Sequence, residues 1–300
     1  MKTETAPAVA PVRREVRPRA GKQSAGLLGG VSHLMLLLWT ILTVTPIVYT
    51  FLNSFKTNTE IFGDSPLALP QSWGWGAWGR AWETSRIGEY LINTVIVVAF
   101  STFFTMLLGS MAAYVLSRYT FRGNRIVYTL FVSGLSIPPF LALSALYKVV
   151  DNVGLLGTHT GVVLVYIAYS LPFTVFFLTA FFKTLPTTVA EAAMMDGCGH
   201  ARTFFQIMLP MARPGLISIT IFNVIGQWNQ YLLPIALLPG DKQDKWLITQ
   251  GIANISTSAG YEADWAGLFA ALSMAIIPIL IVYIIFQRQI QTGLTAGVGK

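Results

Sequence analysis

Six long apolar runs constrain this chain more than any other feature of its sequence. None of them contains Asp, Glu, Lys or Arg in its interior. A helix needs about 20 apolar residues to cross the hydrocarbon core of a bilayer, and inside lipid its backbone groups must be satisfied within the segment. The sequence therefore predicts an all-α membrane protein with six transmembrane helices. The expected spans are approximately residues 34–55, 91–116, 126–147, 161–182, 215–238 and 266–287.

The composition agrees with this class. Charged residues make up 11% of the chain, whereas a typical soluble domain has about 25%. The formal net charge of +7 raises the question of nucleic-acid binding. However, the basic residues flank the apolar runs or fall in the N-terminal segment, and such a distribution indicates membrane topology. We therefore expect membrane lipid around the chain and no nucleic-acid partner.

The charge of the loops predicts the orientation. With the N-terminus inside, the inner segments hold fourteen Lys and Arg residues and the outer segments six, whereas acidic residues number four inside and nine outside. Cytoplasmic loops carry an excess of Lys and Arg, so we expect both termini in the cytoplasm of a multi-pass protein of the cytoplasmic membrane. Residues 1–30 are rich in Ala, Pro, Gly and Arg and predict a disordered basic leader. Residues 31–300 then form the transmembrane domain.

A patterned segment, residues 186–210, separates the fourth and fifth runs. Pro186 suits the start of a helix, and residues 187–196 favour the helical state. Gly197 and Gly199 supply a break, and a second helical piece follows up to Pro210. This predicts two short cytoplasmic helices joined by a glycine turn.

The fifth run holds the densest group of polar residues inside the spans. Trp228 offers a flat face on which a sugar ring can stack, and amide side chains offer donors and acceptors for hydroxyl groups. The same groups are equally suited to a hydrogen-bonded patch between helices. Both interpretations stay open. The candidate residues of a substrate pathway are Asn223, Gln227, Trp228, Asn229 and Gln230.

No catalytic or metal site is indicated, and no cofactor is expected in this chain. Its single cysteine, Cys198, cannot build a zinc site, and the three histidines lie far apart. The segment 293–300 fails the Walker A pattern, with five residues between the glycines and no Ser or Thr after the lysine. The spans lack the ionisable residues typical of proton-coupled carriers. We therefore expect a transport subunit, not an enzyme, that receives its energy from elsewhere.

Three stretches carry a family resemblance. Residues 186–210 resemble the "EAA" loop of ABC importer permeases, with Asp196 also fitting, and we call them the coupling loop after the role that this resemblance implies. The fifth run reads Trp-Asn-Gln-Tyr-Leu-Leu-Pro over 228–234, and the tail contains Gly-Leu-Thr-Ala-Gly from Gly293. Gln230 replaces a usual acidic residue. From about Leu34 the chain resembles the smaller six-span permease of the maltose-type carbohydrate ABC transporters. The matching loop positions are Glu191, Ala192, Ala193, Gly197, Ile207, Leu209 and Pro210.

This resemblance implies an importer that translocates a carbohydrate. It implies a heterodimer with a second permease subunit, two ABC ATPase subunits that hold ATP and Mg, and an extracellular solute-binding protein. It also implies that the coupling loop transmits ATPase motion. A non-ATP-driven channel or secondary carrier for a small polar solute is the alternative. The candidate coupling residues are Glu191, Ala192, Ala193, Asp196, Gly197 and Gly199.

Overall fold

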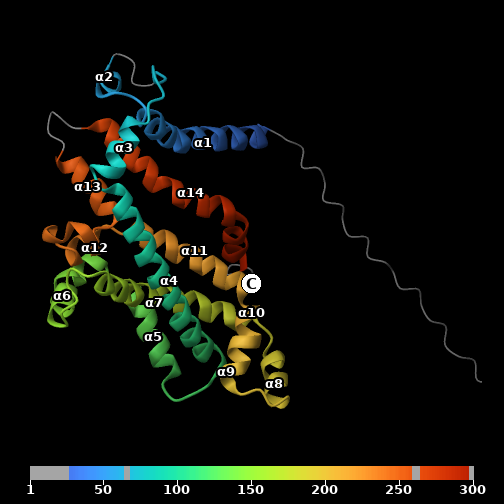
Figure 1. Ribbon diagram of the computed structural model, residues 1–300. Coiled ribbons are helices and arrows are strands. Elements are labelled where there is room, and N and C mark those ends of the chain that lie inside the picture. Colours follow the sequence, from blue (N-terminus) through green and yellow to red (C-terminus); the bar gives the residue numbers. More distant parts are fainter. Residues whose placement is uncertain (1–26, 64–67, 259–263, 297–300) are drawn as a thin grey trace, which may run out of the picture. The chain divides into compact units, whose positions relative to one another are not determined.

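The computed structural model describes residues 27–63, 68–258 and 264–296, and every regular element within them is helical (Figure 1). The chain divides into two compact units, residues 1–48 and 49–300. Helix α1 crosses the boundary between these units. The elements are α1 (Leu27–Asn53), α2 (Asn58–Ile61), α3 (Gly76–Glu83), α4 (Ile87–Arg118), α5 (Asn124–Gly134), α6 (Pro139–Asn152), α7 (His159–Thr184), α8 (Thr187–Met195), α9 (His200–Arg202), the π-helix η1 (Thr203–Met208), α10 (Leu209–Met211), α11 (Arg213–Trp228), α12 (Leu232–Leu237), the 3₁₀-helix η2 (Gly240–Lys245), α13 (Ile248–Ser258) and α14 (Trp265–Ala296).

Four of these helices, α1, α4, α7 and α14, are long and apolar enough to cross a membrane. Two further pairs qualify only if each bent pair counts as one span. The pair α5 and α6 bends by 104°, and residues 200–211 meet α11 at 79°. The described residues therefore hold between four and six candidate spans. Helix α1 begins at Leu27 and so takes in residues 27–30 of the expected leader. Residues 1–26 lie outside the described part of the chain.

Prolines lie at or near the breaks that divide two of the expected runs. Pro138 and Pro139 cannot donate a backbone hydrogen bond, and the run expected at 126–147 is divided there into α5 and α6. The run expected at 215–238 is also divided, because α11 ends at Trp228. Pro234 lacks the N–H that would bond to the carbonyl of Gln230. The hydroxyl of Thr249 donates to that carbonyl instead, at 2.7 Å.

Helices α4 and α7 form the tightest pair in the second unit. A Cβ added to Gly109 of α4 would lie 2.5 Å from the Cγ2 of Thr174 on α7, so the glycine permits the close approach. Helix α11 packs against α4, α7 and α14. Helices α8 and α9 lie at one end of α4, and α3 and α13 lie at the other (Figure 1).

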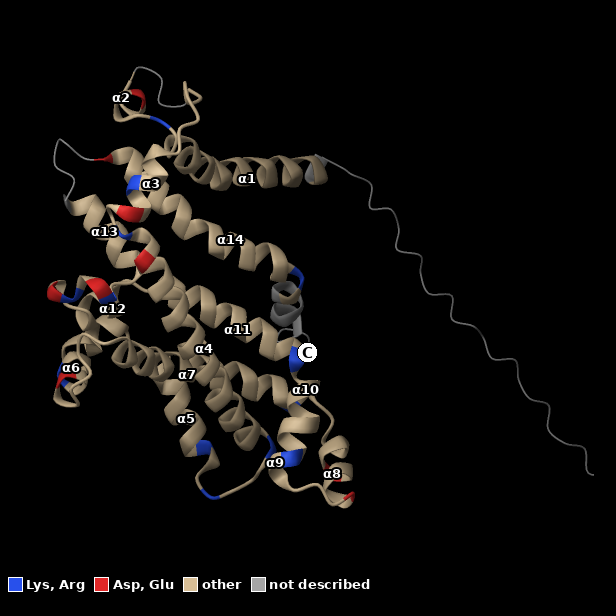
Figure 2. Ribbon diagram, in the orientation of Figure 1, with Lys and Arg blue, Asp and Glu red and all other residues tan. Residues whose placement is uncertain are grey.

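Charge is unevenly placed along this unit. Figure 2 shows basic residues where α5 begins and around α9, whereas acidic residues gather around α2, α3 and α12. Two acidic residues, Glu191 and Asp196, lie at the first end, on or beside α8. The basic end is the one that carries the coupling loop.

Candidate functional site

Helix α8 presents one buried and one exposed face. Ala190 and Ala193 are buried, and Ala190 packs in a cluster with Phe204 and Met208 of η1. Their small side chains let α8 lie close to its support. The opposite face exposes Glu191, and Met195 at the end of the helix is 89% exposed. An acidic group beside an exposed methionine suits contact with another protein, because methionine adapts its shape to a partner surface.

The turn after α8 is a Schellman motif. The N–H of Gly197 donates to the carbonyl of Met194 at 3.1 Å, and the N–H of Cys198 donates to the carbonyl of Ala193 at 2.9 Å. Gly197 has a φ of 81°, in the left-handed region where glycine is favoured. No atom lies within 4 Å of a Cβ added to Gly197 or Gly199. The turn therefore leaves open space on its outer side, which a partner surface can approach.

The coupling loop is tied to the ends of two long helices. The Tyr119 hydroxyl and Nδ1 of His200 are 2.9 Å apart and hydrogen bonded, which joins the residue after α4 to α9. Nη2 of Arg118 donates to the carbonyls of Phe182 and Leu185 at the end of α7, at 2.7 Å each. Displacement of the loop would therefore pull on the end of α4 through Tyr119, and Arg118 links that end to α7.

The polar residues of α11 form a network between three helices. Oε1 of Gln227 accepts hydrogen bonds from the hydroxyls of Ser101 at 2.6 Å and Thr102 at 3.0 Å, both on α4. Nε2 of Gln227 donates to Ser170 of α7 at 3.0 Å. Nδ2 of Asn223 donates to Thr174 of the same helix at 2.9 Å. The helix-bridging role is therefore observed for both amides.

A cavity of about 440 Å³ lies beside this network. It opens where α5 breaks from α6, and α7 and α11 form its other walls. None of its lining residues carries a formal charge. The lining consists of residues 134–139 at the break, Tyr166, Tyr169, Ser170 and Phe173 of α7, Phe222, Asn223, Gly226 and Gln227 of α11, and Gln230.

Only some of the candidate substrate residues lie at the cavity. Asn223, Gln227 and Gln230 line the cavity, whereas Trp228 and Asn229 do not. Trp228 is buried in an apolar cluster, and its indole N–H donates to the carbonyl of Ala275 on α14 at 3.2 Å. In this conformation its ring faces are covered and cannot stack on a sugar. Asn229 is exposed and bonds back to the carbonyl of Ile225.

The α7 wall and the broken helix are not among the residues that the sequence predicted for the substrate pathway. The available signals were the Pro138–Pro139 pair and the polar residues of the fourth run, Tyr166, Tyr169 and Ser170. Neither signal reveals that α7 and the break face each other across one space. That arrangement depends on the 104° bend.

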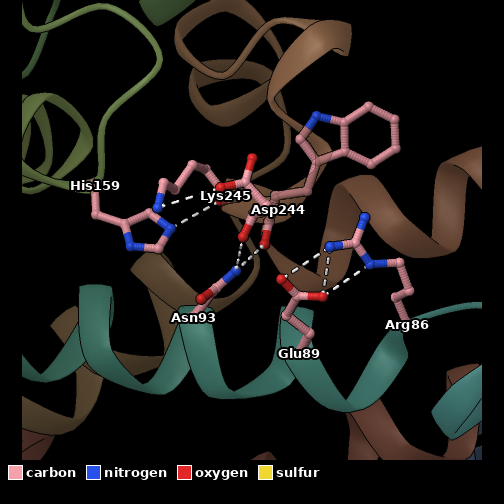
Figure 3. Close-up of polar contacts among 7 residues, drawn as sticks. Arg86, Glu89, Asn93, His159, Asp244 and Lys245 are labelled. Atoms are coloured by element: carbon pink, nitrogen blue, oxygen red, sulfur yellow. Dashed lines mark hydrogen bonds and ion pairs between the residues drawn. The ribbon is translucent and has the colours of Figure 1, made fainter.

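The end of the unit opposite the coupling loop is held by loop contacts. Asn93 of α4 donates from Nδ2 to the carbonyls of Asp244 at 3.0 Å and Trp246 at 3.1 Å (Figure 3). Nε2 of His159 on α7 is hydrogen bonded to the carbonyl of Lys245 at 2.9 Å. Asn93 and His159 therefore fasten η2 and the residue after it to the ends of α4 and α7, respectively.

A bidentate ion pair lies at the same end. Arg80 of α3 donates from Nε and Nη2 to the carboxylate of Asp264, at 2.7 and 2.9 Å. The Arg80 hydrogen bonds hold the pKa of Asp264 below its usual range, against a smaller opposing effect of burial. The N–H of Gly267 also donates to this carboxylate. The pair joins α3 to the start of α14.

Known proteins resemble this chain in sequence. The model of the family described as "binding-protein-dependent transport system inner membrane component" matches residues 105–295. The diacetylchitobiose uptake system permease protein NgcG of Streptomyces coelicolor is 45% identical over 279 residues, which are 93% of this chain and 91% of that relative.

Two solved structures share the fold. A bacterial ABC transporter involved in the import of the acidic polysaccharide alginate matches with a TM-score of 0.78 and 21% identity, over 89% of this chain and 97% of that one. A bacterial alginate ABC transporter in complex with an alginate pentasaccharide-bound periplasmic protein matches with a TM-score of 0.64 and 13% identity, over 89% and 96%.

Proposed function

The chain belongs to the family of binding-protein-dependent transport system inner membrane components, and from this premise we propose that it is the permease subunit of an ABC importer for a carbohydrate. The similarity to a diacetylchitobiose uptake permease over nearly the whole chain supports the substrate class. The uncharged, hydroxyl-matching lining of the cavity agrees with such a substrate.

The energy comes from ATP hydrolysis on a separate subunit. This chain lacks a Walker A sequence, so ATP and Mg belong to a partner ATPase. We propose that two such ATPase subunits and a second permease subunit complete the membrane complex. The family description itself names dependence on a binding protein, which supports delivery of the sugar by an extracellular solute-binding protein.

The membrane arrangement proposed here has six spans. The four long helices cross directly, and the two bent pairs each serve as one further span. The basic end of the second unit then faces the cytoplasm, and both termini lie on that side. This places the coupling loop where a cytoplasmic ATPase can reach it.

The observation that carries the proposal is the construction of α8. Its buried alanines fix it to a packed support, while Glu191, Met195 and the Gly197 turn point away from that support into open space. The Tyr119–His200 hydrogen bond connects the following helix, α9, to the end of α4, and Arg118 links that end to α7. A charge-assisted contact of Glu191 with the ATPase and close approach at Gly197 would transmit the ATPase motion to the cavity.

The proposal is tested by gentle solubilisation of the native membrane and purification of this chain with its partners. We expect an ABC ATPase, a second permease subunit and a solute-binding protein to accompany it. Binding of radiolabelled sugars to the solute-binding protein then identifies the substrate. Recovery of this chain as a homo-oligomer alone, in several mild detergents, together with sugar uptake in cells that lack the ATPase, would contradict the proposal and favour a channel or secondary carrier.

A further inference from the structure

The cavity at the α5–α6 break is a ligand site with a particular chemistry. We propose that this chain itself contacts the sugar there during translocation, and that the cavity accepts uncharged saccharides and rejects acidic ones. This inference rests on the proposed function and deepens it. A volume of about 440 Å³ falls within the range of small-molecule sites, about 300–1,000 Å³.

The cavity supplies hydrogen-bond groups that the protein does not use. The hydroxyl of Tyr166 is buried and has no hydrogen-bond partner among the described residues. The carbonyls of Leu135, Ser136 and Ile137 likewise accept no hydrogen bond within the described part of the chain. A buried polar group without a partner is costly. Tyr166 is fully buried in the cavity wall, so a ligand hydroxyl would recover this free energy when the wall moves to let the two groups pair. All four of these residues line the cavity.

The cavity also supplies aromatic surface. The rings of Phe173 on α7 and Phe222 on α11 are 6.1 Å apart at their centroids, edge to face, and both residues line the space. The ring of Tyr169 lines it as well and is partly exposed. Sugars present apolar C–H faces between their hydroxyls, and a wall that alternates rings with hydroxyl and amide groups matches both.

The electrostatics disfavour a carboxylate. No Lys or Arg lines the cavity, and the unpaired carbonyls present partial negative charge to an incoming ligand. The C-terminal end of α5 and the N-terminal end of α6 meet at this break, so their helix dipoles oppose each other and supply no net positive charge for a carboxylate. A carboxylate that enters without a counter-charge loses its hydration and gains no opposite charge. An uncharged hydroxyl or acetamido group meets no such penalty.

The test uses the fact that this chain has a single cysteine. In a Cys198→Ser background, Gly226→Cys places a thiol on the cavity wall, where an added Cβ meets no atom within 4 Å. Gly79→Cys is the matched control, because Gly79 is also helical and open but lies on α3, outside the cavity. Alkylation of each thiol by a membrane-permeant maleimide is timed in membranes that contain the intact complex.

The probes are diacetylchitobiose and a disaccharide of alginate at equal concentration and ionic strength. At a diacetylchitobiose concentration about twice its dissociation constant, we expect alkylation of the Gly226→Cys variant to be about threefold slower. The alginate disaccharide should have no effect there, and neither sugar should change the Gly79→Cys variant. Equal protection by both sugars would overturn the selectivity. Protection by neither would assign the cavity to lipid or to packing and overturn the inference.

A second measurement decides the matter if the Gly226→Cys variant does not fold. Tyr166→Phe removes the buried hydroxyl and keeps the ring, and Tyr114→Phe removes a buried hydroxyl outside the cavity. We expect the KM for diacetylchitobiose uptake to rise about threefold to tenfold in Tyr166→Phe only. Equal KM values in the two variants would overturn the inference. The proposed function would still stand if uptake depends on this chain and its ATPase. Loss of any such dependence would count against the proposed function itself.

Discussion

Replacement of Gln227 by leucine tests whether its amide holds the bundle together. Leucine has nearly the same volume but removes all three side-chain hydrogen bonds, two to α4 and one to α7. Ser101 keeps a bond to the carbonyl of Val97 at 2.6 Å. Thr102 loses its partner. The change therefore removes polar links at the contact of three helices without opening a large cavity.

The expected cost follows from those contacts. Hydrogen bonds between helices in membranes contribute about 0.6 kcal/mol each on average, so three lost bonds correspond to about 2 kcal/mol. The matched control is Asn229→Leu. Asn229 is exposed and makes only a local bond to Ile225, so its loss should cost at most about 0.5 kcal/mol.

The assay is equilibrium unfolding of the purified chain in mixed micelles, followed by the circular dichroism of its helices. We expect Gln227→Leu to lower the unfolding free energy by about 2 kcal/mol, and by clearly more than the control. Equal stabilities of the two variants would refute the bridging role. Gln227 would then have to be explained by ligand contact alone.

Three further outcomes are expected. Gly109→Leu forces a side chain into Thr174 of α7 and should cost about 1–3 kcal/mol in the same unfolding assay, whereas no loss would refute the close approach. Gly197→Val puts a β-branched residue at a φ of 81°, which should strain the turn by about 1–2 kcal/mol and reduce sugar uptake with normal membrane insertion; unchanged uptake would count against the role of the turn. Asp264→Asn should lower stability at pH 7 by about 0.2–1 kcal/mol because the pair with Arg80 is partly exposed. The pKa of Asp264 is depressed, so this stabilisation is present above the ordinary carboxyl pKa of about 3.9. It is lost as pH falls through the folded-state pKa of Asp264. A difference in stability between variant and wild type that persists at pH 2 would contradict the stabilising role of the ion pair.

Much of the architecture could be predicted because lipid leaves a helix few alternatives. The apolar runs near α1, α4, α7 and α14 were recognisable as candidate spans, since a span must satisfy its own backbone hydrogen bonds within about 20 apolar residues. The glycine turn of the coupling loop also followed from local chemistry, because Gly197 takes the left-handed residue of a Schellman motif. The family resemblance read from that loop and the tail is confirmed.

Other features depend on contacts between distant segments. The Pro138–Pro139 pair indicated a break but not its 104° angle, which neighbouring helices set. Trp228 and Gln227 are adjacent in sequence, yet one packs toward α14 and the other bonds to α4 and α7. Only the rotation of α11 within the bundle decides which side chain meets the cavity. The roles assigned to the coupling residues stay predictions.

The most direct test of the account is the charge at Glu191. Glu191→Lys reverses it on the exposed face of α8, and Glu83→Lys makes the same reversal on an exposed residue of α3 at the other end. Both variants are compared for membrane insertion, co-purification of the ATPase and sugar uptake. We expect normal insertion of both variants, with uptake and ATPase association lost only in Glu191→Lys. Normal uptake and a retained ATPase in Glu191→Lys would contradict coupling through α8.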